Sequence, residues 1–82
     1  MKVYMVVIND EDISLFSSKA KAIKALNMAY KKAINKSGVT EESKKCAKEF
    51  WKLDKTKFSV DVEADIDNVY QLNGYMVEKE VQ

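Results

Sequence analysis

Hydrophobic and polar positions alternate in short runs at the start of the chain. Residues 2–8 (KVYMVVI) are mostly β-branched or aromatic, which is typical of a strand, and residues 13–16 (ISLF) form a second, shorter run. The four residues between them, 9–12, are Asn-Asp-Glu-Asp, whose side chains favour a turn. The chain is therefore predicted to begin with a β-hairpin.

A helical spacing replaces this alternation in the lysine-rich segment 19–36. Either Ser17 or Ser18 supplies its N-cap, and we expect Ser37-Gly38 to end the helix through a left-handed glycine. The apolar residues of the segment recur every three to four positions, and they are Ile23, Leu26, Tyr30, Ala33 and Ile34. This stripe is expected to face the core.

A second helix is expected to begin after Thr40, which can act as its N-cap. Glu41 and Glu42 occupy its first turn, where the helix dipole favours negative charge. The helix is expected to end within residues 54–57. Its predicted buried side consists of Cys46, Phe50 and Leu53, together with Val39 just before the helix.

The last third of the chain returns to strand patterns. In residues 58–66 (FSVDVEADI) the apolar side chains Phe58, Val60, Val62, Ala64 and Ile66 alternate strictly with polar ones. A turn at 67–68 leads to a returning strand at 69–72. Asn73-Gly74 is then a strong signal for a two-residue hairpin before a last strand at 75–81. The alternative is a bulge at Asn73-Gly74 within one long strand.

The predicted element order is β-β-α-α-β-β, and a hairpin at 73–74 would add a fifth strand. Strands that are segregated from helices in this way indicate an α+β fold. We expect an antiparallel sheet of four to five strands with two α-helices packed on one face. Residues 1–82 are expected to form a single domain.

Composition supports an ordered protein outside the membrane. The 82 residues are 46% hydrophobic and 33% charged, and they include no proline. No stretch approaches the roughly 18 apolar residues of a membrane span, and acidic residues follow the first apolar run where a signal peptide would have small ones. A single cysteine permits no internal disulfide, so we expect a cytoplasmic location.

The residue inventory argues against catalysis. The chain has no histidine, which removes the commonest general base and the usual transition-metal ligand. Cys46 is assigned to the core rather than to nucleophilic chemistry, and Gly38 and Gly74 are isolated rather than part of a phosphate-binding loop. We therefore expect a protein that is not an enzyme and that uses no cofactor or metal.

Lysine dominates the first two thirds of the chain and produces one candidate surface. Residues 1–57 hold thirteen lysines against seven acidic residues, and none of the basic residues is arginine. On the first helix Lys24, Met28 and Lys31 fall opposite the apolar stripe, while Lys48 and Trp51 are expected to be exposed on the second. These five residues are the predicted partner-binding set. The alternative is an ordinary solvated helix face, with Trp51 closing the edge of the core.

Residues 58–82 have the opposite charge balance, with one lysine against six acidic residues. Asp61, Glu63 and Asp65 should project from one face of their strand at intervals of about 6.6–7 Å. This is close to the phosphate spacing of a nucleic-acid strand, so the acidic face could imitate DNA and occupy a DNA-binding cleft. The alternative is simply the wet face of an antiparallel sheet.

The opening KVYMVVIND, followed by LFSSKAKAIKAL, resembles small phage and mobile-element accessory proteins, in which a hairpin leads through Phe-Ser-Ser into a lysine–alanine helix. The resemblance covers residues 2–26. It implies a phage-encoded protein that binds and alters a host or defence protein.

The predicted function is accordingly a small non-enzymatic protein-binding modulator, an inhibitor of a larger host protein. Two other classes remain open. One is direct nucleic-acid binding through the lysine-rich helix faces, and the other is a homodimer formed by an edge strand such as ISLF or YMVEKEV.

Overall fold

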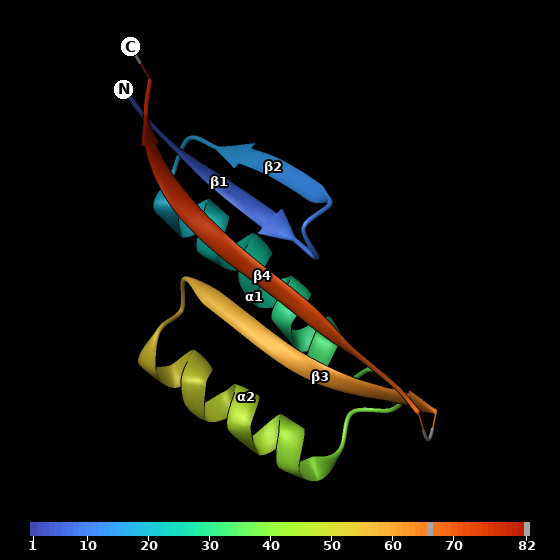
Figure 1. Ribbon diagram of the computed structural model, residues 1–82. Helices are drawn as coiled ribbons and strands as arrows, with labels where there is room; N and C mark the ends of the chain where they lie inside the picture. The colour runs from blue at the N-terminus through green and yellow to red at the C-terminus, as the bar shows by residue number, and fades with distance from the viewer. Residues whose placement is uncertain (66, 82) are drawn as a thin grey trace.

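Four strands form one antiparallel sheet in the order β2-β1-β4-β3. The computed structural model describes residues 1–65 and 67–81, and its elements follow the order β-β-α-α-β-β (Figure 1). They are β1 (Lys2–Ile8), β2 (Asp12–Phe16), α1 (Lys19–Ile34), α2 (Glu41–Leu53), β3 (Lys57–Asp65) and β4 (Asn68–Glu80). The predicted α+β fold is confirmed. The predicted strand residue Ile66 lies outside the described residues.

The first and last strands are neighbours in the middle of the sheet. β1 pairs with β4 from Lys2 opposite Glu80 to Ile8 opposite Gly74, so the two ends of the chain lie side by side (Figure 1). The β1–β2 turn forms as predicted, with Asn9 and Asp10 at φ values of 53° and 59°. Asparagine and aspartate tolerate this left-handed region better than most residues.

Both helices begin at the predicted caps. The Ser18 hydroxyl accepts a hydrogen bond from the Lys21 backbone N–H (3.1 Å), and the Thr40 hydroxyl accepts one from that of Ser43 (3.1 Å). The predicted end of the first helix is wrong, because α1 ends at Ile34 with Asn35 as its C-cap.

Gly38 serves the connection to the sheet instead of capping α1. It has a φ of +97°, and its carbonyl accepts a hydrogen bond from the Glu63 N–H at the edge of β3 (2.8 Å). A Cβ at this position would lie 2.6 Å from the Glu63 carbonyl oxygen. Glycine is therefore required both by its backbone angle and by the close approach to β3.

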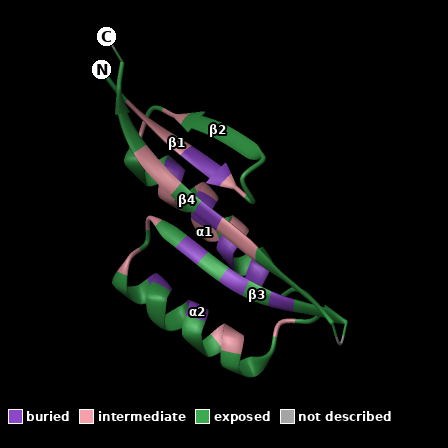
Figure 2. Cartoon of the chain, in the orientation of Figure 1, coloured by how far each residue is buried: buried purple, intermediate pink, exposed green. Residues whose placement is uncertain are grey.

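The core lies between the helices and one face of the sheet. α1 contacts all four strands, and α2 packs along β3 (Figure 1). Tyr30 of α1 stacks on Trp51 of α2 at 4.7 Å between ring centroids, and both rings meet the edge or face of Phe58 from β3. Figure 2 shows the buried positions alternating along β3, as the pattern at Phe58, Val60 and Val62 predicts.

The predicted buried side of the second helix is wrong. α2 buries Ala47 and Trp51, whereas Cys46, Phe50 and Leu53 are exposed. The helix carries two adjacent apolar stripes, and only the one that faces Tyr30 and Phe58 is used in the core.

The predicted hairpin at Asn73-Gly74 is also wrong. The alternative is correct in expecting one long strand, but wrong in expecting a bulge at these residues. β4 runs through both residues without a register shift, so the described residues form four strands and not five. Gly74 lies between Ile8 of β1 and Phe58 of β3. A Cβ there would lie 2.6 Å from Phe58 Cε1 and 2.9 Å from Leu26 Cδ1, so this glycine permits α1 to pack closely on the sheet.

Candidate functional site

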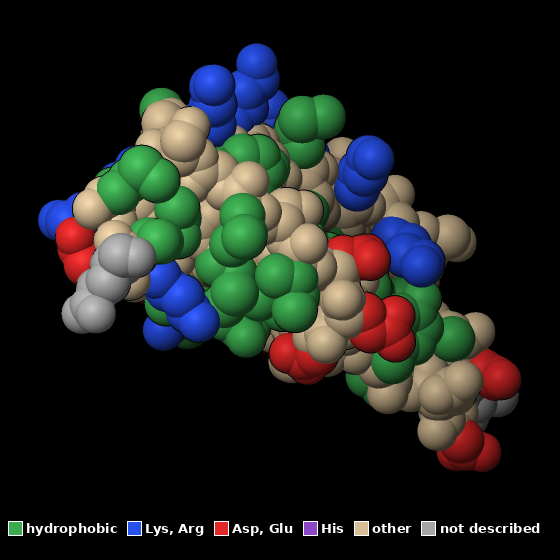
Figure 3. All heavy atoms as spheres, turned by 90° about the horizontal axis from the view of Figure 1, so that it is seen from above, with side chains coloured by type: hydrophobic (Ala, Val, Ile, Leu, Met, Phe, Trp, Pro, Cys, Tyr) green, Lys and Arg blue, Asp and Glu red, His purple; other side chains and the backbone are tan. Residues whose placement is uncertain are grey.

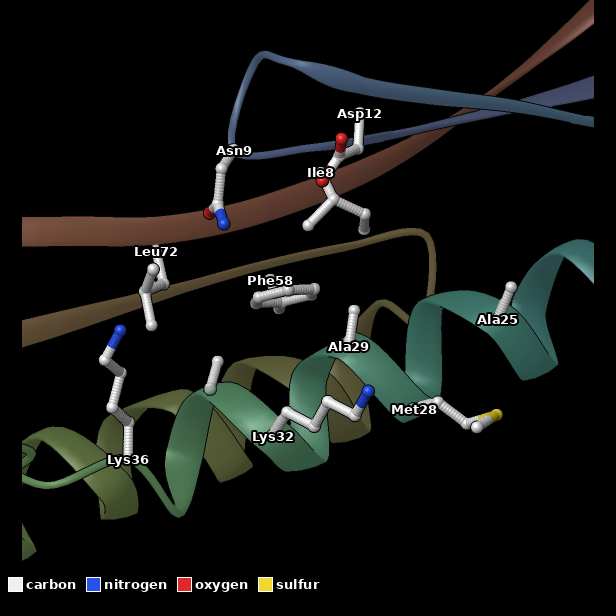
Figure 4. Close-up of a pocket in the computed structure, with 11 residues that line it drawn as sticks. Ile8, Asn9, Asp12, Ala25, Met28, Ala29, Lys32, Lys36, Phe58 and Leu72 are labelled. Atoms are coloured by element: carbon white, nitrogen blue, oxygen red, sulfur yellow. The ribbon is translucent and has the colours of Figure 1, made fainter.

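A groove runs between α1 and the sheet. Figure 4 shows Ile8 and Asn9 on the sheet side, Phe58 and Leu72 across the middle, and two lysines on the opposite side, Lys32 of α1 and Lys36 just after its end. Its lining is mainly apolar. On the sheet side, Asn9 Oδ1 accepts a hydrogen bond from the Asn73 N–H (2.9 Å). The groove is thus a mainly apolar depression with Asp12 on the sheet side and two lysines on the opposite rim.

The predicted lysine surface is exposed but does not form one site. Lys24, Lys31 and Lys48 all face solvent, and Met28 is 55% exposed. Lys24 borders a shallow groove between the two helices, whereas Met28 borders the groove against the sheet. Among the described residues, the lysines of α1 take part in none of the ion pairs.

The expectation that Trp51 is partly exposed is wrong, and the alternative that it closes the core is correct, because only 6% of its surface is accessible. The indole fills the space between Tyr30 and Phe58, and the Lys55 ammonium lies over the ring, 5.7 Å from its centroid. Trp51 forms part of the floor of the groove that Lys24 borders. With its faces covered in this way it is a core residue, so it cannot stack on a base or insert into a partner without rearrangement.

The strongest exposed apolar feature on α2 was assigned to the core by the sequence pattern. Phe50 is 69% exposed and Leu53 is 84% exposed. Together with Cys46 they follow a spacing of four and three residues, which places the three side chains on one side of the helix. The signal for these residues was therefore present in the sequence, but periodicity alone could not show that the stripe faces solvent.

Acidic residues border the beginning of this stripe. Cys46 lines a depression together with Glu42 of α2 and with Asp61 and Glu63 of β3. We call the residues Glu42, Cys46, Phe50, Leu53, Asp61 and Glu63 the α2–β3 surface. It combines exposed apolar side chains with carboxylates from two elements that are adjacent in space.

Only two members of the predicted acidic face stay together. Asp61 and Glu63 alternate regularly and pair with Gln71 and Val69, and the Gln71 side-chain amide donates to Asp61 Oδ1 (3.4 Å). Asp65 pairs with Asn68, which is a register shift of one residue. This irregularity interrupts the alternation of faces, so the expectation that all three carboxylates form one even row is wrong beyond Glu63.

One carboxylate next to the surface has an altered pKa. The Thr56 hydroxyl and then the Thr56 backbone N–H donate hydrogen bonds to Asp54, and these bonds hold the pKa of Asp54 below its ordinary value. Asp54 follows the last residue of α2, and Thr56 is also bonded to β4 through its carbonyl, which accepts from the Met76 N–H (2.8 Å). These bonds fix the short connection between α2 and β3.

No family model, curated protein or solved structure matches this chain. Within residues 1–65 and 67–81, no helix is long and apolar enough to cross a membrane. In the same residues, no three or more His, Cys, Asp or Glu side chains are grouped so that they could hold a metal ion.

Proposed function

We propose that this protein is a non-enzymatic protein-binding module that docks through the α2–β3 surface. The observation that carries the proposal is the exposure of Phe50 and Leu53, at 69% and 84%, on a helix whose other apolar stripe is already buried. Large apolar side chains at helical spacing are a common way for a helix to anchor in a partner's groove. Burying the Phe50 ring in such a groove would supply roughly 1.5–3 kcal/mol.

The acidic border defines the chemistry of the partner. Asp61 and Glu63 lie two residues apart on a strand, at a spacing of about 6.6–7 Å, and Glu42 stands beside them. We infer a protein cleft with an apolar centre and a basic rim. A nucleic-acid-binding cleft has such a rim, so occupying it would inhibit the partner by competition with its nucleic acid.

The proposal favours the acidic surface over the lysine surface. Direct binding of nucleic acid would use the groove bordered by Lys24 and Lys55, but the aromatic ring at its floor belongs to the buried Trp51. Stacking on bases is the usual second component of single-strand binding, and this groove offers no exposed ring for it.

The experiment is a quantitative capture from host-cell lysate with nuclease present. Tagged protein is compared with Phe50→Ala and with Asp61→Lys/Glu63→Lys, and Lys24→Glu/Lys31→Glu serves as a control whose charge change is equal in size and opposite in sign. We expect the native chain to capture a nucleic-acid-binding protein, and we expect DNA added after the nuclease has been washed away to displace it. With the captured partner purified, Phe50→Ala should weaken its binding free energy by more than about 2 kcal/mol, or the affinity by roughly 30-fold.

Stability measurements keep the result interpretable. Because Phe50 is largely exposed, Phe50→Ala should change the free energy of unfolding by less than about 0.5 kcal/mol. The proposal is wrong if the captured protein is lost with Lys24→Glu/Lys31→Glu and kept with the two α2–β3 variants. It is equally wrong if the captured protein has no affinity for nucleic acid.

A further inference from the structure

The two edges of the sheet are treated differently by the fold. At the β3 edge, α2 lies alongside the strand, and the Gly38 carbonyl accepts a hydrogen bond from the Glu63 N–H. At the other edge, β2 pairs with β1 on one side only, and no strand among the described residues pairs with its outer side. The backbone groups on that side are therefore available to another strand.

β2 is short, at five residues, and begins with Asp12, but it lacks the other features that usually prevent an edge strand from pairing. Its sequence, DISLF, contains no lysine, no proline and no bulge. Ile13 is 63% exposed and Leu15 is 66% exposed, although hydrophobic side chains at an edge promote association. Both project from the face away from α1, because their cross-strand neighbours Val7 and Met5 alternate with the core residue Val6.

The apolar surface continues from the edge into the sheet. Val7 pairs with Ile13 on one side and with Tyr75 on the other, and it is buried although no helix covers this face. Figure 3 looks onto the β2 side of the molecule and shows hydrophobic side chains gathered there, with acidic side chains to one side of them. An incoming strand would extend this surface and cover the edge side chains.

The charges at the two ends of β2 identify the occupant. Asp10 and Glu11 lie in the turn before the strand, and Lys19 and Lys21 lie in the first turn of α1 after it. That first turn contains no acidic residue, although negative charge is favoured at a helix N-terminus. An antiparallel copy of the same strand would bring the acidic turn of one protomer to the lysine-bearing helix start of the other, twice by symmetry.

We propose that β2 pairs antiparallel with the β2 strand of a second copy of this chain. The resulting homodimer has one continuous sheet of eight strands about a two-fold axis near Ser14. In this register Ile13 lies opposite Leu15 of the second copy, so the exposed apolar pair becomes a cross-strand contact. The α2–β3 surface is at the far edge of the sheet and stays free, so each dimer carries two copies of it.

The first test is the mass of the native protein in solution, measured by sedimentation equilibrium over a dilution series. We expect twice the monomer mass at high concentration and reversible dissociation on dilution. Leu15→Lys should raise the dimer dissociation constant at least about tenfold, because it places a charge in the contact twice. A native protein that is monomeric at every concentration overturns the proposal.

Two further variants test the arrangement itself. Val77→Lys changes the same face of the sheet two strands away from the edge, so it should leave the edge-paired dimer unchanged. Asp10→Asn/Glu11→Lys should weaken the dimer, and adding Lys19→Glu/Lys21→Glu should restore it, since the two charge clusters meet only between copies. Asparagine at position 10 keeps the positive φ accessible.

Circular dichroism and urea unfolding of each variant distinguish a variant that is monomeric but folded from one that has lost its fold. Loss of the dimer in Val77→Lys would indicate packing of sheet faces and would overturn edge pairing. Failure of the charge exchange to restore the dimer would overturn the antiparallel register. Neither outcome changes the capture result expected for Phe50→Ala and Asp61→Lys/Glu63→Lys, because these variants alter α2 and β3 at the opposite edge of the sheet.

Discussion

Gly74 provides the most direct test of how α1 packs on the sheet. Its backbone adopts no left-handed angle, so alanine is compatible with the local conformation. The added methyl group is not compatible with the packing, because its carbon would lie 2.6 Å from Phe58 Cε1 and 2.9 Å from both Ile8 Cδ1 and Leu26 Cδ1. Favourable carbon–carbon separations begin near 3.5 Å, so the shortest contact is about 1 Å too close.

The neighbours of Gly74 differ in how easily they can move. The terminal methyl groups of Ile8 and Leu26 can rotate away, although Leu26 is fully buried. The Phe58 ring is held by Tyr30 and Trp51, whose centroids lie 5.9 and 6.4 Å from its own. Overpacking of this kind costs about 1–3 kcal/mol, and removing a strand glycine returns about 0.5–1 kcal/mol. Gly74→Ala should therefore destabilise the protein by roughly 1–2 kcal/mol.

Urea unfolding followed by Trp51 fluorescence measures this change, because Trp51 is the sole tryptophan and lies beside Phe58. Phe58→Leu removes the closest carbon and completes a double-mutant cycle with Gly74→Ala. If the clash with the ring is the cause, the double mutant should be more stable than the sum of the single effects by at least about 0.5 kcal/mol. A neutral or stabilising Gly74→Ala, or strict additivity in the cycle, would refute the packing argument.

Two further predictions concern the helix ends. Ser18→Ala removes the hydroxyl that accepts from the Lys21 N–H and should cost about 1 kcal/mol of unfolding free energy in urea; a cost near zero would show that the cap is replaceable. For Asp54, the Thr56 hydrogen bonds lower the pKa of the folded protein below that of the unfolded chain. They therefore stabilise the fold fully at pH values above the unfolded pKa, and this stabilisation is lost as the pH falls through the folded pKa. Asp54→Asn should thus be less stable than the native chain at neutral pH, and the difference should shrink under acid in urea titrations at successive pH values; a pH-independent difference would contradict it.

The candidate site shows where the sequence pattern was informative and where it was not. The exposure of Lys24, Met28 and Lys31 is confirmed, since it follows from their position opposite the apolar stripe of α1. The prediction that Trp51 is exposed was wrong, because its position on the helix was compatible both with the flank and with the core. Phe50 carried an equally clear apolar signal, but nothing in the sequence indicated that its stripe has no neighbour in the fold.

The sequence by itself determined the local structure of this protein. The hydrophobic period indicated the strands and helices. The serine pair 17–18 and Thr40 indicated where the helices begin, because capping depends only on residues within one turn. The tertiary structure decided which stripe of α2 is buried, because Tyr30 and Phe58, which are distant in sequence, form the surface that accepts Trp51. It also decided that Gly74 is a packing position and not a turn, because Phe58 of β3, Ile8 of β1 and Leu26 of α1 converge on the space that a side chain there would occupy.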